Sequence, residues 1–448
     1  MPRRRILFVT DLDVWLLQES GQIVRKAGNQ SLYNTLRGYA RAGWEVEVLT
    51  AKDVHGGIET LPDGIRIRRE EMLLQRPVRL VRKALARLRP TVPASTTPGQ
   101  QAPRTQLAPE TIDNPGRWAV FQMDMGARAL ARCLAWRPDV IYGYEIYGAP
   151  VAVTLGRALR IPSVTRFQGT LLGAWADDLT VMRRFRTHVA AMRAPANLLV
   201  MADDGTLGDV VLGRLGAPME RVRFWMNGVV KEDIEAARER RTNASTNPTS
   251  SVDRARPSVA TQRAPLRLLT ASRLVEWKRV DRVLDVLAQL PADVPTWTLE
   301  IAGDGPERSA LVEMACRLGL ADRVKFLGPI SHDEVMDRLV QADAYLSLYD
   351  LSNLSNGVLE AAVAGVPVFA LDVGGTSHLV EDGVTGVLVR PDRLFDDGTR
   401  RLARLLSDDS WRAKLSGGAL EAGRTRIRTW EQRMQLEITE VEALLASR

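Results

Sequence analysis

The sequence has very little cysteine. Its two cysteines, Cys133 and Cys316, lie far apart in 448 residues, which excludes a disulfide framework and a cysteine-based zinc cluster. No apolar run reaches the roughly 20 residues that span a bilayer. The opening "MPRRRILFVTDLDVW" has an apolar stretch too short for a signal peptide, broken by Asp11 and Asp13. We therefore expect a cytoplasmic protein, either soluble or peripheral at the inner face of a membrane.

Acidic side chains are outnumbered by basic ones. The chain has 61 Lys and Arg against 54 Asp and Glu, a net charge of +7, which favours acidic partners such as phosphorylated ligands or anionic lipid. No nucleic-acid-binding module is recognisable, and aromatic residues do not interleave with the basic ones, so nucleic acid is not an expected partner. The length suits two or three domains rather than one.

Short apolar runs rich in β-branched residues alternate with helical periodicity along nearly the whole chain. This alternation predicts α/β domains with doubly wound parallel sheets. Residues 90–116 are interpreted as a polar insertion, and residues 236–265 as a flexible linker. The predicted divisions are an N-terminal Rossmann-like domain over 1–235, a C-terminal one over 266–428 and a final helix over 429–448. Such a pair predicts a ligand cleft between the domains, at the carboxyl ends of the strands.

Two loops that follow predicted strands of the second half carry candidate binding residues. After "WTLEIA", Gly303 and Gly305 make a turn, but Arg308 replaces the third glycine of a dinucleotide fingerprint, so a plain tight turn is as good an interpretation. After "LRLLTAS", Arg273 and Lys278 flank a predicted helix start. Cations beside free helix N–H groups form a diphosphate site. The alternative is a solvated basic helix start.

The stretch "LSNLSNGVLEAAVAGVPV", residues 351–368, follows another predicted strand. One of Asn353, Ser355 and Asn356 can cap the next helix, which leaves other groups of the turn for a ligand oxygen. Glu360 is then either an acid for ribose hydroxyls or a residue that stabilises the helix dipole. With the later Gly374-Gly375 turn, these strand-end loops together describe a pocket for a nucleoside diphosphate.

These segments resemble the C-terminal domain of family 4 retaining glycosyltransferases of the GT-B fold, in which two Rossmann-like domains face each other across a cleft. The similarity covers about 160 residues and includes "ASRLVEWKRVDRVLDVLAQL", "LEIAGDGPERSAL", "RVKFLGPISHDEVMDRLVQADAYL" and "NGVLEAAVAGVPVFALDVGGTSHLVEDGVTGVLV". In the first half, "AGNQSLYNTLRGYARAGWEVEVLT" and "MNGVV" are similar to the family's glycine loop and to its segment before the interdomain crossing.

The resemblance implies a role for each candidate residue. Arg273 and Lys278 would be the catalytic cations that bind the donor diphosphate, and Glu360 would contact the ribose. The other implied donor-site residues are Gly28, Asn29, Gly303, Gly305, Asn356, Gly374 and Gly375. Ser352 stands where the family's Glu-x7-Glu motif has its first Glu, and Gln168 where many members have a His. These two residues and Asp13 are the candidate contacts to the sugar or the acceptor.

The implied function is transfer of a sugar, with retention of configuration, from a nucleoside-diphosphate sugar to a glycan or lipid-linked acceptor, in polysaccharide or glycoconjugate biosynthesis. The alternative is a non-catalytic nucleotide-sugar-binding protein of the same fold. Fixed cations suffice to stabilise the leaving diphosphate, so no metal or cofactor is expected. The "DLD" of residues 11–13 is interpreted as a loop beside the cleft rather than a metal site.

A basic amphipathic helix is predicted over residues 76–90, "RPVRLVRKALARLRP". Val78, Val81, Leu85 and Leu88 share one face, and no acidic residue occurs in the segment. Such a helix either lies on an anionic membrane surface or packs its apolar face on its own domain.

Overall fold

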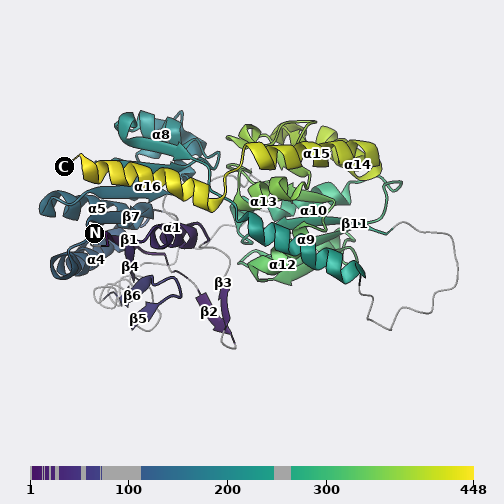
Figure 1. The fold of residues 1–448 in the computed structure, drawn as a ribbon. Helices are drawn as coiled ribbons and strands as arrows, with labels where there is room; N and C mark the ends of the chain where they lie inside the picture. Colours follow the sequence, from purple (N-terminus) through teal and green to yellow (C-terminus); the bar gives the residue numbers. More distant parts are fainter. Residues whose placement is uncertain are drawn as a thin grey trace.

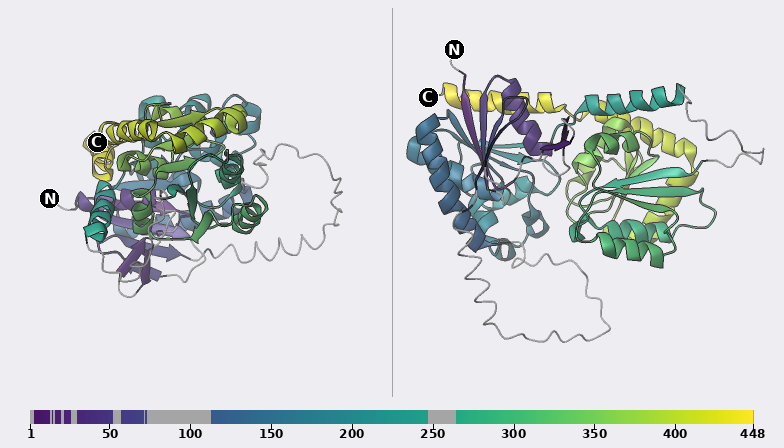
Figure 2. Two further views of the ribbon diagram at one scale, coloured as in Figure 1. Left: turned by 90° about the vertical axis from the view of Figure 1, so that its right-hand side faces the viewer. Right: turned by 90° about the horizontal axis from the view of Figure 1, so that it is seen from below.

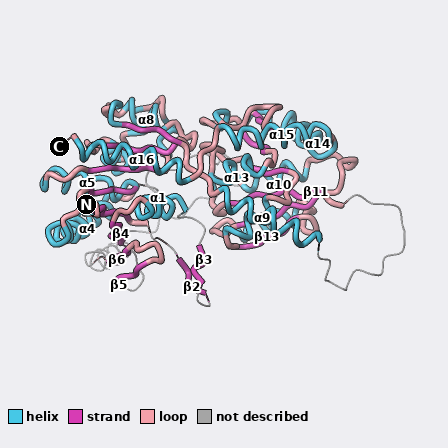
Figure 3. Tube along the Cα trace, in the orientation of Figure 1, coloured by secondary structure: helices cyan, strands magenta, loops and turns pink. Residues whose placement is uncertain are grey.

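The computed structural model describes residues 3–12, 14, 16–19, 22–25, 30–51, 57–70, 72, 113–246 and 264–447. Within them the chain forms two α/β domains side by side (Figure 1). Each domain is a mostly parallel sheet with helices on its two faces (Figures 2 and 3). The predicted architecture of two Rossmann-like domains is confirmed. The predicted helix over 76–90, most of the 90–116 insertion, Asp13, Gly28 and Asn29 lie outside the described residues.

The N-terminal sheet has eight strands within the described residues, and only the edge strand β5 runs antiparallel to its neighbour. The central strands are buried almost throughout because helices cover both faces, which is why their sequences are near-continuous apolar runs. In sheet order the strands are β10 (Val222–Trp225), β9 (Leu198–Ala202), β8 (Ser163–Phe167), β7 (Val140–Tyr144), β1 (Arg5–Thr10), β4 (Glu45–Ala51), β6 (Arg66–Glu70) and β5 (Gly57–Thr60).

The helices of this domain cover both faces of the sheet. They are α1 (Gln30–Arg41), α4 (Pro115–Trp136), α5 (Glu145–Leu159), α6 (Leu179–Met182), α7 (Arg186–Met192) and α8 (Gly208–Arg214), with 3-10 turns at Leu171–Trp175 and Met219–Arg221. Asn114 caps α4, since its side chain accepts from the N–H of Arg117, and Pro115 suits the first helical position. A separate hairpin joins β2 (Leu16–Glu19) and β3 (Gln22–Arg25).

The C-terminal sheet is wholly parallel, with six strands within the described residues. In sheet order they are β13 (Val324–Gly328), β12 (Trp297–Ala302), β11 (Leu266–Ala271), β14 (Ala344–Ser347), β15 (Val368–Leu371) and β16 (Gly386–Val389). The associated helices are α9 (Lys231–Thr246), α10 (Val280–Ala288), α11 (Arg308–Arg317), α12 (His332–Leu339), α13 (Asn356–Ala364), α14 (Thr399–Ser407) and α15 (Asp409–Thr425). Short turns lie at Glu276–Lys278, Thr376–His378, Pro391–Arg393 and Leu394–Gly398.

Helix α9 corrects one sequence prediction. Residues 236–246 were predicted to belong to a flexible linker, but they continue the helix that begins at Lys231. Ile234 and Ala237, one helical turn apart, are buried in the same apolar cluster as Met336 and Val358 of the C-terminal domain. The remaining positions are mostly polar, and that composition hid the two residues that anchor the helix.

The last helix, α16 (Trp430–Ala446), lies along the N-terminal domain (Figure 1). Its Trp430, Met434, Ile438 and Val441 belong to the core cluster that contains Phe8 and Tyr142. A buried ion network adds to this packing: Glu437 accepts from Arg166 (3.2 Å) and Arg433 (3.1 Å), and all three side chains are inaccessible to solvent. The chain crosses between the domains twice, and the two crossings are joined by hydrogen bonds of Val229 to Arg428 and Trp430.

No helix among the described residues is long and apolar enough to cross a bilayer.

Candidate functional site

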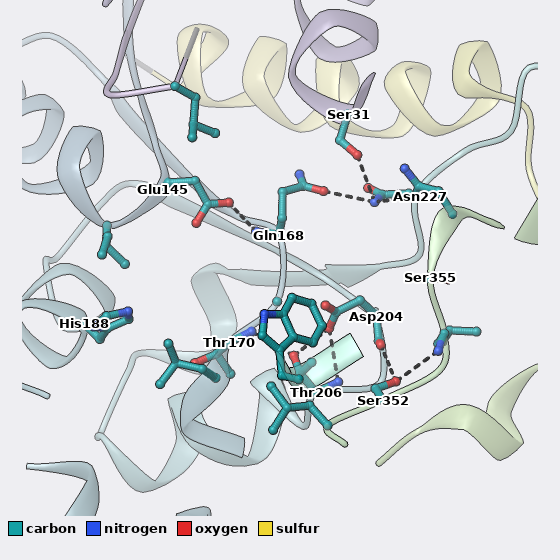
Figure 4. Close-up of a pocket in the computed structure, with 18 of the residues that line it drawn as sticks. Ser31, Glu145, Gln168, Thr170, His188, Asp204, Thr206, Asn227, Ser352 and Ser355 are labelled. Carbon is teal, nitrogen blue, oxygen red and sulfur yellow. Dashed lines mark hydrogen bonds between the residues drawn. The ribbon is translucent and has the colours of Figure 1, made fainter. Parts of the chain in front are cut away.

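A cleft of about 570 Å³ opens between the two domains, at the carboxyl ends of both sheets. Its N-terminal wall comes from loops after β7, β8 and β9 and from the start of α1. Its C-terminal wall comes from the loops that follow β11 and β14. The lining residues are Leu12, Ser31, Leu32, Tyr144, Glu145, Ile146, Gln168, Gly169, Thr170, Leu171, His188, Met192, Asp204, Thr206, Asn227, Trp277, Lys278, Leu351, Ser352, Leu354, Ser355 and Asn356 (Figure 4).

Lys278 is a cation on the C-terminal wall. Its Nζ lies 4.2 Å from the ring centre of Trp277 and 3.7 Å from that of Tyr349. Burial lowers the pKa of Lys278 to about 7; the Asp204 carboxylate opposes this shift and the Arg273 guanidinium adds to it. An anion bound beside Lys278 would therefore stabilise the protonated ammonium.

The N-terminus of α13 is the second anion-binding element of this wall. Ser355 is the N-cap, but its side chain makes no capping bond. The first N–H groups of a helix have no intrahelical acceptor and carry a partial positive charge. Ser355 and Asn356 both line the cleft, so this helix start can bind the oxygen atoms of an anionic ligand.

Polar side chains form the facing wall. Asn227 Nδ2 lies 3.0 Å from the Gln168 amide and 3.2 Å from Ser31 Oγ. Turning the Gln168 amide by 180° lets its oxygen accept from Tyr144 Oη (2.8 Å) and Arg166 Nε (2.9 Å). Arg166 also donates to Asn227 Oδ1 at 3.0 Å. The ion network under α16 thus continues through Arg166 into the wall of the cleft.

Glu145 is a strained residue in the same wall. Its φ of 62° lies in the left-handed region, which is unfavourable for a residue with a Cβ. Its Oε1 accepts from the backbone N–H of Gln168 at 2.8 Å (Figure 4). Burial raises the pKa of Glu145 to about 8, with the charge of Asp11 adding to the shift. At neutral pH the carboxyl group is mostly protonated and can act as a hydrogen-bond donor in the cleft.

The loop after β9 joins the two walls. Ser352 Oγ donates to the backbone oxygen of Asp204 at 2.6 Å, and the Gly375 N–H donates to Gly205 O at 2.7 Å. A Cβ at Gly374 would come within 2.1 Å of Gly205 O, so only glycine permits this approach. Asp203 Oδ1 lies 3.6 Å from His378 Nδ1. These contacts hold the cleft in a closed arrangement.

Comparison with known proteins agrees with this arrangement. Residues 251–421 match the family model "Glycosyl transferases group 1". This part of the chain is therefore a group 1 glycosyl transferase domain. The chain is 24% identical to a glycogen synthase of Mycobacterium tuberculosis over 279 residues, which is 61% of each chain. It therefore spans about three fifths of the length of that relative.

Solved structures of similar fold cover both domains of this chain. A sucrose-phosphate synthase from Thermosynechococcus elongatus aligns over 100% of both chains, with a TM-score of 0.68 at 17% identity. Anabaena HepE in complex with UDP-glucose aligns over 97% of this chain and 99% of its own, with a TM-score of 0.61 at 19% identity. The chain therefore has the GT-B fold, as its sequence predicted.

Four of the predicted site residues line the cleft: Lys278, Gln168, Ser352 and Asn356. Arg273 is exposed and outside the lining, although its charge acts on Lys278. Gly374 and Gly375 contact Gly205. Gly303 and Gly305 serve packing, because a Cβ on either would collide with a backbone oxygen, of Ser272 at 1.9 Å or Leu274 at 2.2 Å.

Glu360 lies beside the cleft rather than in its lining. Helix α13 begins at Asn356, so Glu360 lies in its second turn, and its side chain is buried. The carboxylate accepts from Gln30 Nε2 at 3.4 Å and lies 3.8 Å from His332 Nε2. Burial raises the pKa of Glu360, and the interactions with His332 and Gln30 act to lower it. An acid that only stabilises the helix dipole would not be buried here.

Sequence reasoning missed Glu145, Asp204 and Asn227. Glu145 and Asp204 both follow strands that the sequence predicts, "DVIYGY" and "NLLVMA". Polar residues at strand ends indicated the site in the second half of the chain. The same position would have indicated Glu145 and Asp204 in the first half. Asn227 lies in the "MNGVV" segment, and no local signal showed that its side chain faces the cleft.

Proposed function

We propose that the protein transfers a sugar, with retention of configuration, from a nucleoside-diphosphate sugar to a glycan or lipid-linked acceptor. The match of residues 251–421 to the group 1 family model supports this proposal, as does the full-length likeness to HepE, which was solved with UDP-glucose. The observation that carries it is the pairing of Lys278 with the N-terminus of α13 at one wall of an interdomain cleft.

The C-terminal wall suits a leaving diphosphate. As the bond between the sugar C1 and the diphosphate oxygen breaks, negative charge grows on that oxygen. The Lys278 ammonium and the N–H groups of α13 are already in place to stabilise the charge, without reorganisation. The acceptor oxygen forms its bond to C1 on the same face of the sugar, and its proton passes to the departing diphosphate. Arg273, close enough to affect Lys278, would bind the outer phosphate oxygens after a side-chain rotation.

Glu360 is proposed to accept hydrogen bonds from the ribose hydroxyls. Its carboxylate now interacts with Gln30 of the N-terminal domain, and ribose hydroxyls would replace that donor. Glu360→Gln should weaken binding of a nucleoside diphosphate more than binding of inorganic pyrophosphate. Equal losses of affinity for the two ligands would contradict a contact between Glu360 and the ribose.

A donor panel tests the proposal. UDP, GDP and ADP are each compared with a matching sugar conjugate, namely UDP-glucose, GDP-mannose and ADP-glucose, by thermal unfolding. A ligand at a hundred times its dissociation constant adds about 2.7 kcal/mol to the free energy of unfolding. One pair should raise the melting temperature, and the conjugate should then release its nucleoside diphosphate with a suitable acceptor. No stabilisation by any pair would contradict the proposal.

A non-catalytic nucleotide-sugar-binding protein is the second candidate. Ser352 favours it, because this residue stands where the family's motif has an acid and its hydroxyl is occupied by Asp204. Turnover separates the two functions. Binding of a conjugate without transfer or hydrolysis, over a broad set of glycan and lipid-linked acceptors, would support the binding protein.

A further inference from the structure

Asp204 occupies a fixed position at the carboxyl end of β9. Thr206 donates twice to its Oδ1, from the backbone N–H at 3.1 Å and from Oγ1 at 2.6 Å. Its backbone oxygen accepts from Ser352 of the other domain. Figure 4 shows the hydrogen bonds that join Asp204 to Thr206 and to Ser352 in the cleft wall. The Thr206 bonds therefore orient the carboxylate, and the Ser352 bond links the backbone of Asp204 to the C-terminal domain.

The second carboxylate oxygen, Oδ2, receives neither of the Thr206 bonds. It lies beside Gly169, another lining residue, where a Cβ would be only 2.0 Å from it. Gly169 has a φ of 92°, and the Asp204 carboxylate occupies the space that a side chain at residue 169 would fill. A glycine at residue 169 is therefore needed for the carboxylate to take this position in the lining of the cleft.

Lys278 and Asp204 both line this cleft, and the Asp204 carboxylate raises the pKa of Lys278. The proposed diphosphate site and this carboxylate therefore belong to one region of the cleft. In a nucleoside-diphosphate sugar, the sugar is bonded to the outer phosphate. A phosphate at Lys278 accordingly brings the sugar hydroxyls to the part of the cleft where Asp204 lies.

We propose that Asp204 accepts a hydrogen bond from a hydroxyl group of the transferred sugar through Oδ2, and so helps to select the donor sugar. This inference rests on the proposed function. Hydrogen bonds to a charged acceptor are stronger than those between neutral groups. A site built to accept from a hydroxyl also discriminates strongly against an analogue that lacks it, because the buried acceptor is then left without a partner.

Asp204→Asn is the discriminating variant. An asparagine keeps an oxygen for Thr206 and places an NH2 group where Oδ2 was, so size is unchanged and only the hydrogen-bonding character at that atom is reversed. The matched control is Asp209→Asn, the same change at an exposed position of α8. The probes are the matched pairs of the donor panel, measured by titration calorimetry.

The expected result is that D204N binds the nucleoside diphosphate at least as tightly as wild type but binds the sugar conjugate at least tenfold more weakly, while D209N matches wild type for both. Conjugates that lack one hydroxyl at a time then locate the partner. One of these deoxygenated conjugates should bind wild type weakly. The affinity of D204N for that conjugate should be no lower than its affinity for the complete conjugate.

Equal losses of affinity for the diphosphate and the conjugate would overturn the inference, and so would an unchanged affinity for the conjugate. Failure of the proposed function looks different, because wild type itself would then bind no member of the panel. A lower melting temperature of D204N without ligand, with both affinities reduced, would assign Asp204 a structural role and also overturn the inference.

Discussion

The hydroxyl of Ser352, in the C-terminal domain, donates a 2.6 Å hydrogen bond to the backbone oxygen of Asp204, in the N-terminal domain. The two residues are separated by 148 positions in the chain. The bond closes one end of the cleft in which Lys278, the start of α13 and Asp204 lie. The contact that closes the two domains on each other therefore also brings the residues of the proposed site together.

Removal of this bond should weaken donor binding. Ser352→Ala deletes the hydroxyl, and a typical hydrogen bond contributes about 0.5–1.5 kcal/mol. We expect the affinity for the nucleotide sugar to fall several-fold in titration calorimetry. Ser407→Ala, at an exposed position of the same domain, is the control and should leave the affinity unchanged. If S352A bound the nucleotide sugar as tightly as this control, Ser352 would have no part in closing the cleft.

Gly374 tests closure by steric means. A Cβ at residue 374 would come within 2.1 Å of Gly205 O, and its φ of 55° adds strain. Gly383 has a comparable φ of 71° but nothing within 4 Å of a built Cβ, so Gly383→Ala reproduces the strain without the collision. We expect Gly374→Ala to lower kcat/KM at least tenfold relative to Gly383→Ala. Equal activities would contradict a closed working state.

Lys278 gives donor binding a pH dependence. Its pKa of about 7 in the free protein leaves much of the side chain neutral above pH 7, and a bound diphosphate raises the pKa by favouring the charged form. Binding at pH 8 should therefore take up a proton, and affinity should fall as the pH rises above 7. Calorimetry in buffers of different ionisation enthalpy measures this uptake.

Lys278→Met is the control for that experiment, because Asp204 and Glu145 also titrate in the cleft, with pKa values of about 6 and 8. The difference between wild type and K278M isolates the lysine. An identical proton uptake in both proteins would show that Lys278 does not meet the diphosphate.

The buried ion network should contribute to the attachment of α16, in addition to its apolar packing. Burial alone would raise the pKa of Glu437, but the Arg166 and Arg433 guanidiniums lower it below its usual range. This carboxylate therefore stabilises the fold above its unfolded pKa, and the stabilisation is lost as the pH falls through the lower folded pKa. Glu437→Gln leaves two buried cations without their charge partner and should cost about 3–5 kcal/mol.

Thermal unfolding checks the effect of that substitution. Glu440→Gln is the control, since its ion pair with Arg223 is partly exposed, and we expect it to cost less than about 1 kcal/mol. Equal melting temperatures for the two variants would show that the network does not hold the helix.

Much of the fold was predictable because the central strands are buried on both faces and appear in the sequence as uninterrupted apolar runs. The runs "RILFVT" and "LRLLTAS" contain β1 and β11. Helix α9 was missed because only Ile234 and Ala237 are fully buried in its first half. Two apolar positions give too weak a helical repeat to distinguish this segment from a polar linker.

The site was predictable only in part. Lys278 and Asn356 were found because strand-end position and residue type together indicate an anion site. The strand-end position of Asp204 was open to the same reasoning, but its contacts depend on how the domains close, since its neighbours Ser352 and Lys278 come from the other half of the chain. No local pattern contains that relation. The buried position of Glu360 depends in the same way on Gln30 of the N-terminal domain.

The most direct test of the central claim, that this cleft holds a nucleoside-diphosphate sugar with its diphosphate at Lys278, is the affinity of the Lys278→Ala variant. Calorimetry would compare it with Lys325→Ala, a change at an exposed lysine of β13, using the nucleoside diphosphate that stabilises wild type. We expect K278A to bind at least tenfold more weakly, a loss of about 1.4 kcal/mol or more, and K325A to match wild type. Equal affinities for the two variants would contradict the account.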